Sequence, residues 1–523
     1  MAFSGGGAKG IVHVGALKAL EARPVTFVGL SGTSAGAIVA TLAAAGFTAD
    51  EIINPESGYT IIGALSELDP KLRRATDLFG PGGWWRIRLF RALLKQRISF
   101  GAALGISWCL LALLGFMFLY LSLPWFPLLF LIVWVSVGIV SWWIYRSIMG
   151  GLADVSRFRN ALDRLLQQKI FPNEPARVVT MGDFGVEGRP SLKIVSANLS
   201  KHRLHLFSPE RSPAVAAADA VAASICLPVI FSPWFIDDEP HIDGGIVSNL
   251  PAWSFDEERE LDPEALTIAI EIEAPRQLKA GRYSWLLAAI RTALAGSAEL
   301  NVRVSGPAEQ LALPTRLDLL DFDITTAAAK QEVRDVAAAV GLRLDKRLFR
   351  LPEIYRNACQ VAQAIAIDGL GLTPGSTGDD HRVRVAVGRL ERGYSRSVRF
   401  SYSVGFEDDT DEAMLVPLEG SVAGAAWRER QSILELYPLD TERDLPGPAN
   451  RYRRKSRWRG LVWVMCIPIL DDQASTPRLL VHLDGNSPLA QDASTATALN
   501  DVEAAVRDFF SLVLHELKDL EGA

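Results

Sequence analysis

The stretch VTFVGLSGTSAGAIVA, residues 25–40, decides the fold expected for the N-terminal half of the chain. Its first six residues form a mainly apolar run that reads as a buried strand, and its last four, Ala37–Ala40, read as part of a helix. Between them Gly32 and Gly36 flank Ser34 in a Gly-x-Ser-x-Gly pentapeptide, the pattern of a tight turn that presents a nucleophile between strand and helix. Ser34 is therefore the first candidate catalytic residue.

A glycine-rich turn, SGGGAKG at residues 4–10, precedes this stretch and opens a helix. Backbone N–H groups at a helix start can bind an anion, either a phosphate or the oxyanion of an acyl-transfer intermediate. Gly5, Gly7 and Gly10 also match a dinucleotide-binding fingerprint, which expects an acidic residue about 20 residues further on. The Ser34 turn stands at that place instead, which disfavours a nucleotide-binding protein.

The serine needs a base, and none of the seven histidines stands in a convincing position for that role. His13 and His241 are the two that could assist. A carboxylate can serve directly when its site excludes water, because burial raises its basicity. The candidate is Asp243, since Gly244 and Gly245 follow it and allow close approach of the backbone.

In three places these residues resemble the patatin-like phospholipase family. The three motifs are Gly5–Gly10, Gly32–Gly36, and Ala223–Phe231 running into Asp243–Gly245 with Asn249 and Pro251. The resemblance covers roughly residues 1–75 and 150–350. It implies an α/β fold of the patatin-like kind, a three-layer α/β/α hydrolase, in agreement with the alternating strands and helices of the sequence.

The resemblance also implies a Ser–Asp catalytic dyad, with no cofactor and no metal. Ser34 would attack an ester carbonyl, and Asp243 would take its proton. The oxyanion would lie against the N–H groups of Gly5, Gly6 and Gly7. The residues expected to support these motifs are Lys9, Gly10, Gly32, Gly36, Gly244 and Gly245. The expected enzyme is a lipid acyl hydrolase, and its substrate is a phospholipid or another lipid ester.

Alternative functions stay open at this point. The substrate could be a small soluble ester, or the chain could be a catalytically inactive, membrane-tethered sensor or scaffold. The inactive protein would require Ser34 and Asp243 to lie apart in the fold. Lys9 reads as a solvated side chain at a helix start, with contact to a phosphate as its functional alternative.

A long apolar insertion interrupts the hydrolase pattern, because residues Ile98 to Tyr145 include no Asp, Glu, Lys, Arg or His. We expect a transmembrane hairpin with spans at about 101–121 and 128–148, since a span takes about 20 apolar residues. Tryptophans and arginines flank the insertion and place both of its ends on the cytoplasmic side. The expected location is a bacterial inner membrane, with the catalytic and C-terminal domains facing the cytoplasm and the bilayer as a partner.

The chain is expected to have the following order: hydrolase domain, first part (1–75); basic flank and hairpin (76–150); hydrolase domain, second part (151–370); linker (371–382); C-terminal domain (383–523). The C-terminal domain resembles an α+β GAF-type sensor through Leu415–Leu418, Gly420–Trp427, Val464–Ile469 and a closing helix. The resemblance implies regulation through a small-molecule ligand or through contacts in a homo-oligomer.

Charge and cysteine content limit the other partners. The net charge is −6, so we expect no nucleic acid as a partner. A basic run at Arg451–Arg459 reads as a solvated loop or as a contact with an anionic membrane surface. The four cysteines are too far apart for a disulfide framework or a metal site, which indicates a reducing compartment.

Overall fold

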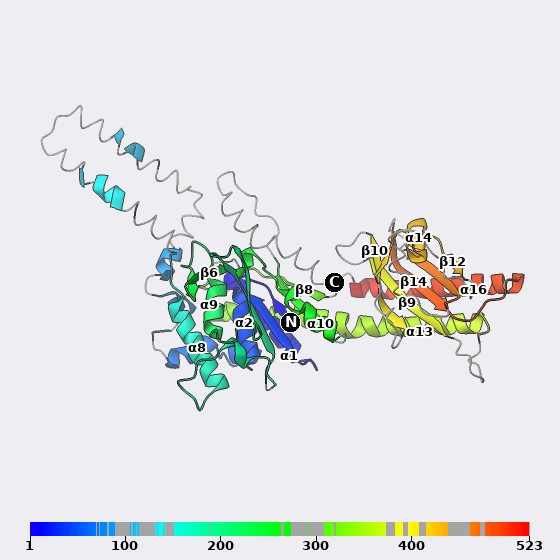
Figure 1. Ribbon diagram of the computed structural model, residues 1–523, viewed down its shortest axis with the longest axis horizontal. Helices are drawn as coiled ribbons and strands as arrows, with labels where there is room; N and C mark the ends of the chain where they lie inside the picture. Colours follow the sequence, from blue (N-terminus) through cyan, green and yellow to red (C-terminus); the bar gives the residue numbers. More distant parts are fainter. Residues whose placement is uncertain are drawn as a thin grey trace. The chain divides into compact units, whose positions relative to one another are not determined.

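The computed structural model divides the chain into two compact units, Met1–Arg343 and Leu344–Ala523, which we describe one at a time (Figure 1). The described residues are 1–68, 71–72, 74–80, 83–88, 105, 108–110, 112–113, 131–132, 134–139, 142, 151–186, 188–262, 266–273, 292, 308–317, 319, 321–372, 382–390, 396–406, 415–437, 461–470 and 476–521. The basic run 451–459 and most of the expected linker lie outside them.

The first unit is built on an eight-stranded mixed sheet with strand order β5-β6-β3-β2-β1-β7-β8, in which β4 also pairs with β3. The strands are β1 (Ala2–Phe3), β2 (Gly29–Thr33), β3 (Ser191–Asn198), β4 (Arg203–Phe207), β5 (Trp234–Ile236), β6 (Glu239–Asp243), β7 (Thr267–Ile272) and β8 (Ala308–Leu313). Neighbours from β3 through β2, β1 and β7 to β8 are parallel. The pairs that involve β4, β5 and β6 are antiparallel.

The helical elements of this unit lie between and around these strands. They are η1 (Gly7–Ile11), α1 (Val12–Glu21), α2 (Ala35–Ala44), α3 (Ala49–Ile52), α4 (Ile61–Leu68), η2 (Ala75–Phe79), α8 (Ser156–Ile170), η3 (Met181–Asp183), α9 (Ala217–Ile225), η4 (Gly244–Ile246), η5 (Ala252–Phe255), α10 (Asp256–Leu261) and α12 (Thr326–Leu344). Helices α2 and α9 contact β3, and η5 contacts β2 and β7.

Strand β2 shows that the sheet is covered on both faces. Gly32 lies against α2, because a Cβ at that position would meet the backbone of Gly36. Ser31 and Thr33 project in the opposite direction, where their hydroxyls donate to carbonyl oxygens of the 248–251 segment. The predicted α/β fold is therefore confirmed for this unit.

The strand before the serine turn lies further along the chain than predicted. The apolar pattern predicts a strand at Val25–Leu30, whereas β2 spans Gly29–Thr33. Val28 is 70% exposed, while Ser31 and Thr33 are fully buried. These two polar residues can lie in the core because their hydroxyls have hydrogen-bond acceptors there, and a count of apolar residues does not detect such partners.

The transmembrane hairpin predicted for the insertion is wrong. Among the residues that the structure describes, no helix has both the length and the apolar character that crossing a bilayer requires. In the two expected spans the longest described stretch is 134–139, and the greater part of both spans lies outside the described residues. The fold is corrected to an α/β domain without this hairpin. The multi-pass location in an inner membrane, which depended on the hairpin, is corrected with it.

The second unit contains a six-stranded antiparallel sheet with strand order β11-β10-β9-β14-β13-β12. Its strands are β9 (Val383–Leu390), β10 (Ser397–Val404), β11 (Leu415–Pro417), β12 (Ile433–Leu436), β13 (Trp463–Leu470) and β14 (Pro477–Gly485). Its helices are η6 (Asp345–Arg350), α13 (Leu351–Gly369), α14 (Val422–Glu429) and α16 (Ala493–Glu521). The closing helix that the sequence predicts for this domain is α16.

Alternate residues of this sheet build two separate cores, as the period of two in a strand requires. Val383, Val385 and Val387 of β9 lie in a core with α13 and α16. Ala386 lies in the other core, together with Trp427 of α14. Helices α13 and α16 thus lie against one face of the sheet, and α14 lies against the other. The end of β9 and the start of β14 lie near both helical layers.

Candidate active site

Ser34 occupies a strained turn between β2 and α2. Its backbone has φ 54° and ψ −125°, a positive φ that residues other than glycine adopt only where the surroundings impose it. The Ser34 amide donates to the Ser224 hydroxyl at 2.9 Å. That hydroxyl in turn donates to the Val195 carbonyl oxygen at 2.6 Å. The turn is therefore held by α9 and β3, and Ser34 itself is 7% exposed.

The Ser34 hydroxyl donates a hydrogen bond to the Asp243 carboxylate, with 2.6 Å between Oγ and Oδ2. The other carboxylate oxygen, Oδ1, accepts from the Gly245 amide at 2.7 Å. Asp243 is only 2% exposed. The structure thus brings the two predicted catalytic residues into direct contact, with the carboxylate held from its second oxygen.

The pairing pattern of β3 explains why these two residues meet. Strand β4 pairs with one edge of β3 along Ile194–Asn198, so β2 and β6 share the other edge. On that edge Thr33, the last residue of β2, lies opposite Val195, and Asp243, the last residue of β6, lies opposite Ser196. Since β2 is parallel to β3 and β6 is antiparallel to it, their final residues approach each other end to end.

Burial changes the acidity of Asp243. Loss of hydration raises the pKa of its carboxyl group to about 6, although the hydrogen bonds from Ser34 and from the Gly245 amide act in the opposite direction. A carboxylate with a raised pKa is a better proton acceptor than a solvated aspartate. The site therefore contains a hydroxyl in contact with an unusually basic carboxylate.

Gly32 and Gly36 are required by close backbone contacts around the turn. A Cβ on Gly32 would lie 2.4 Å from the carbonyl oxygen of Gly36. A Cβ on Gly36 would lie 2.5 Å from the carbonyl oxygen of Phe3 and 2.6 Å from that of Ser4. Because these neighbours are backbone atoms, the structure leaves no room for a side chain at either position.

Replacing Gly36 with alanine should lower the free energy of unfolding by at least about 2 kcal/mol, because the new methyl group would overlap with backbone atoms of β1. Gly63→Ala is a matched control in another helix, α4. A Cβ there would lie 3.5 Å from Thr60 Oγ1, an ordinary contact, so this variant should be unchanged or more stable by up to about 1 kcal/mol. Urea unfolding of the intact chain measures both, and equal stability of the Gly36 variant and the parent would contradict the argument.

The glycine turn at the start of η1 lies directly beside Ser34. A Cβ on Gly5 would lie 3.1 Å from Ser34 Cβ and 2.5 Å from Asn249 Oδ1. The Gly5 amide donates to the Asn249 carbonyl oxygen at 3.0 Å, so its N–H is already engaged. Gly7 has φ +55° and lies against the Leu319 carbonyl oxygen. Of the three amides predicted to face an oxyanion, those of Gly6 and Gly7 are therefore the better candidates.

The remaining motif residues have structural positions. A Cβ on Gly10 would overlap with Ala35 Cβ, and one on Gly244 would overlap with the Val195 carbonyl oxygen. Gly10 thus lets η1 contact the start of α2, and Gly244 lets η4 contact β3. Lys9 is only 9% exposed, so it is not the solvated side chain that its place at a helix start suggests.

Comparison with known proteins gives the family of the N-terminal part of the chain. The family model of the patatin-like phospholipases matches residues 1–256. This part of the chain is a patatin-like phospholipase domain. The predicted family and enzyme class, a lipid acyl hydrolase, are thereby confirmed for the domain.

Individual relatives are distant. The uncharacterized protein YqhO of Bacillus subtilis (strain 168) is 26% identical over 294 residues, which are 53% of this chain and 73% of that protein. The structure of VipD from Legionella pneumophila has a TM-score of 0.30 at 19% identity, over 65% of this chain and 66% of VipD. A GAF domain of a sensor histidine kinase from Bacillus halodurans has a TM-score of 0.22 at 16% identity, over 31% of this chain and 97% of that domain.

The two histidines considered as bases have other roles in the patatin-like domain. Burial lowers the pKa of His13 to about 4, so its ring is neutral near pH 7 and its Nε2 donates to the Ser4 carbonyl oxygen at 2.8 Å. Burial also lowers the pKa of His241 to about 4. The ring nitrogens of His241 are within hydrogen-bonding distance of Ser196 and Asn198 of β3. His13 therefore holds the start of the glycine turn, and His241 holds β6 to β3.

Sequence reasoning did not assign a role to Ser224 or Asn249, which position the turn and the glycine loop of the patatin-like domain. Both residues stand inside the stretch that carries the family resemblance. A search for polar residues within that stretch could have identified them. Their exact partners, however, depend on contacts between segments that are far apart in the sequence.

Proposed function

We propose that the patatin-like domain hydrolyses ester bonds of phospholipids or related lipid esters, with Ser34 as nucleophile and Asp243 as general base. The observation that carries this proposal is the 2.6 Å hydrogen bond from Ser34 Oγ to Asp243 Oδ2 in a buried site. A serine hydroxyl in contact with a basic carboxylate can be deprotonated as it attacks. Membership of the domain in the patatin-like phospholipases supports a lipid ester as substrate.

In the proposed first half-reaction, Ser34 Oγ attacks the carbonyl carbon of the ester while Asp243 Oδ2 accepts the hydroxyl proton. The negative charge that develops on the carbonyl oxygen is stabilised by the N–H groups of Gly6 and Gly7 at the start of η1. When the tetrahedral intermediate collapses, Asp243 returns the proton to the departing alcohol. The acyl group then remains as an ester on Ser34.

In the second half-reaction, Asp243 accepts a proton from a water molecule that attacks the acyl-Ser34 ester. Collapse of this intermediate breaks the bond to Ser34 Oγ, which takes the proton back from Asp243. A free fatty acid leaves. The two halves use the same groups, so one carboxylate can serve as base and acid in turn.

The activity should depend on pH through Asp243. The carboxylate form is the one that accepts the serine proton, and burial raises the pKa of this group to about 6. Hydrolysis should therefore be fully active above this pKa and should fall as the pH is lowered through about 6. The profile of kcat/KM between about pH 4 and pH 9 checks this. A midpoint near 4, the ordinary value for an aspartate, would argue against a buried Asp243 as the base.

Release of free fatty acid from phospholipid vesicles by the purified protein tests the proposed function. Fatty acid release that disappears in Ser34→Ala supports it. Hydrolysis of small soluble esters without any release from phospholipid would favour a soluble substrate. If no ester is cleaved and a fluorophosphonate probe leaves Ser34 unlabelled, the domain is an inactive scaffold and the proposal is wrong.

We also propose that the second unit is a GAF-like regulatory domain. Support comes from its antiparallel sheet with helices on both faces, which suits the sensor resemblance of the sequence. An unrestrained lipid hydrolase would damage the lipids of its own cell. Control by a ligand of the second unit would limit that damage.

A further inference from the structure

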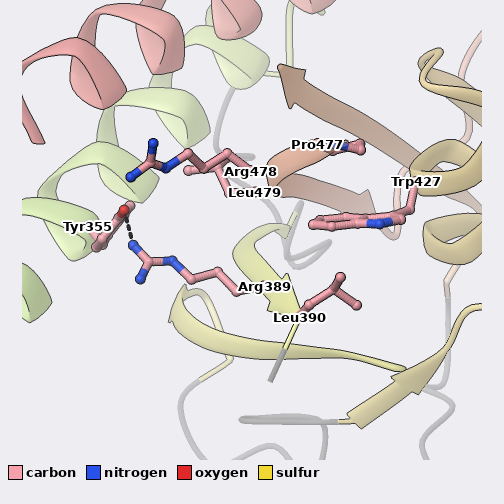
Figure 2. Close-up of a pocket in the computed structure, with 7 residues that line it drawn as sticks. All are labelled: Tyr355, Arg389, Leu390, Trp427, Pro477, Arg478 and Leu479. Carbon is pink, nitrogen blue, oxygen red and sulfur yellow. Dashed lines mark hydrogen bonds between the residues drawn. The ribbon is translucent and has the colours of Figure 1, made fainter. Parts of the chain in front are cut away.

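A pocket opens in the second unit at the ends of β9 and β14 (Figure 2). It is lined by Tyr355, Arg389, Leu390, Trp427, Pro477, Arg478 and Leu479. These residues come from α13, β9, α14 and β14, so the pocket lies where the two helical layers reach the same end of the sheet. It belongs entirely to the second unit and shares no residue with the dyad.

One end of the pocket is cationic. Figure 2 shows Arg389 and Arg478 extending in the same direction, toward the side where Tyr355 lies. Arg389 donates to the Tyr355 hydroxyl, and its guanidinium lies 4.4 Å from the centre of the Tyr355 ring. That ring is buried and stacks on Tyr402 at 4.8 Å. Arg389 is therefore held in place before any ligand binds, which lowers the entropy cost of binding.

The other end of the pocket is apolar. Trp427, Leu390 and Pro477 lie there, away from the two guanidinium groups (Figure 2). Trp427 is largely buried in the core under α14, whereas Leu390 is 39% exposed. A ligand that fills the whole pocket must therefore carry an anionic group at one end and an apolar body at the other.

The size of the pocket narrows the class of ligand. It holds about 190 Å³, which is below the range of about 300–1,000 Å³ that is usual for drug-sized ligands. A small ligand suits this volume better than one with the size of a nucleotide. A carboxylate suits the cationic end, since the planar guanidinium group of arginine can bind it through two parallel hydrogen bonds.

We propose that this pocket binds a monocarboxylate with a short or medium apolar chain. The carboxylate contacts Arg389 and Arg478, and the first carbons of the chain contact Leu390, Trp427 and Pro477. Such a molecule has the chemistry of the fatty acid that the proposed hydrolysis releases. The identification of the ligand as a reaction product rests on the proposed function, whereas binding of the carboxylate does not.

Calorimetric titration of octanoate into the intact Ser34→Ala protein tests the proposal without any turnover. We expect saturable binding that Arg389→Gln and Arg478→Gln, added to that background, each weaken by at least about tenfold, since hydrogen bonds to a charged group are lost. Leu390→Ser should reduce the preference for octanoate over acetate. Arg428→Gln is the matched control, because Arg428 is an exposed arginine of α14 that does not line the pocket.

Octanol and inorganic phosphate are the two comparison ligands that could overturn the proposal. Octanol lacks the carboxylate, so binding of octanol as tight as that of octanoate would overturn the proposal. Inorganic phosphate that binds more tightly than octanoate would also overturn it, because the apolar end would then be unused. Octanoate binding that the two arginine variants leave unchanged would place the ligand elsewhere on the chain, and the pocket would not be its site.

This test separates the pocket from the catalytic proposal. If the parent protein releases no fatty acid but octanoate binding depends on both arginines, the pocket stands and the proposed hydrolysis fails. If fatty acid is released but octanoate does not bind to the pocket, the hydrolysis stands and the pocket proposal is wrong. Thermal unfolding of each arginine variant shows whether it is folded before the titration is interpreted.

Discussion

Ser34→Ala should lower kcat/KM for ester hydrolysis by at least about 10⁴-fold, the scale of loss seen when the nucleophile of a serine hydrolase is removed. The variant loses the Oγ that would form the acyl-enzyme, and Asp243 has no hydroxyl left to deprotonate. The backbone of the turn should stay in place, because the Ser34 amide still donates to Ser224 and the alanine adds no atoms. The measurement is fatty acid release from phospholipid vesicles, with labelling by a fluorophosphonate probe as a second readout.

The matched control for this variant is Ser200→Ala. Ser200 is an exposed serine in the turn after β3, outside the site, and its replacement should leave both readouts at the parent level. Probe labelling that persists in Ser34→Ala would show that another residue is the nucleophile. In that case the hydrogen bond between Ser34 and Asp243 would have only a structural role.

Asp243→Asn should reduce hydrolysis by about 10⁴-fold, because a neutral amide cannot accept the serine proton. Ser34 remains present, so slow labelling by a reactive fluorophosphonate should still be detectable in this variant. The loss should lie mainly in kcat, since the carboxylate acts in the proton transfer and not in binding the lipid. Comparison of kcat and KM on the same vesicles measures this division.

Asp243→Asn should also change how the stability of the protein depends on pH. The pKa of Asp243 is about 6 in the folded protein and 3.8 ordinarily. Ionisation of the buried carboxyl group therefore lowers the free energy of unfolding as the pH rises from about 4 to 6. Asp243→Asn should remove that pH dependence in urea unfolding. Asp238→Asn, in the exposed turn before β6, is the control that should keep it. Full hydrolytic activity in Asp243→Asn would exclude this residue as the base.

The residues of the candidate site were recognisable from the sequence because they belong to short local motifs. A serine between two glycines, placed between a strand and a helix, encodes its own backbone geometry. Asp243 was recognisable from the glycines that follow it. The family of residues 1–256 and its enzyme class followed from these motifs, as the family model confirms. The catalytic roles of Ser34 and Asp243 stay predictions until the variants are measured.

Apolar composition was a weaker guide than the motifs. It predicted a transmembrane hairpin that the described helices do not support. It also placed the strand before Ser34 too early, because it does not register that buried hydroxyls such as those of Ser31 and Thr33 can find acceptors. Both errors came from treating hydrophobicity as the only property that decides where a segment lies.

The sequence by itself determined which residue types stand in the serine turn, the glycine turn and the aspartate turn. Tertiary structure alone decided that Ser34 and Asp243, which are 209 positions apart, meet end to end along one edge of β3. It also decided that the Gly5 amide is engaged by Asn249, and that Arg389 and Arg478 share a pocket with Trp427. The physical reason is that local backbone geometry is set by neighbouring residues, whereas contacts between distant segments depend on the order and register of strands in a sheet.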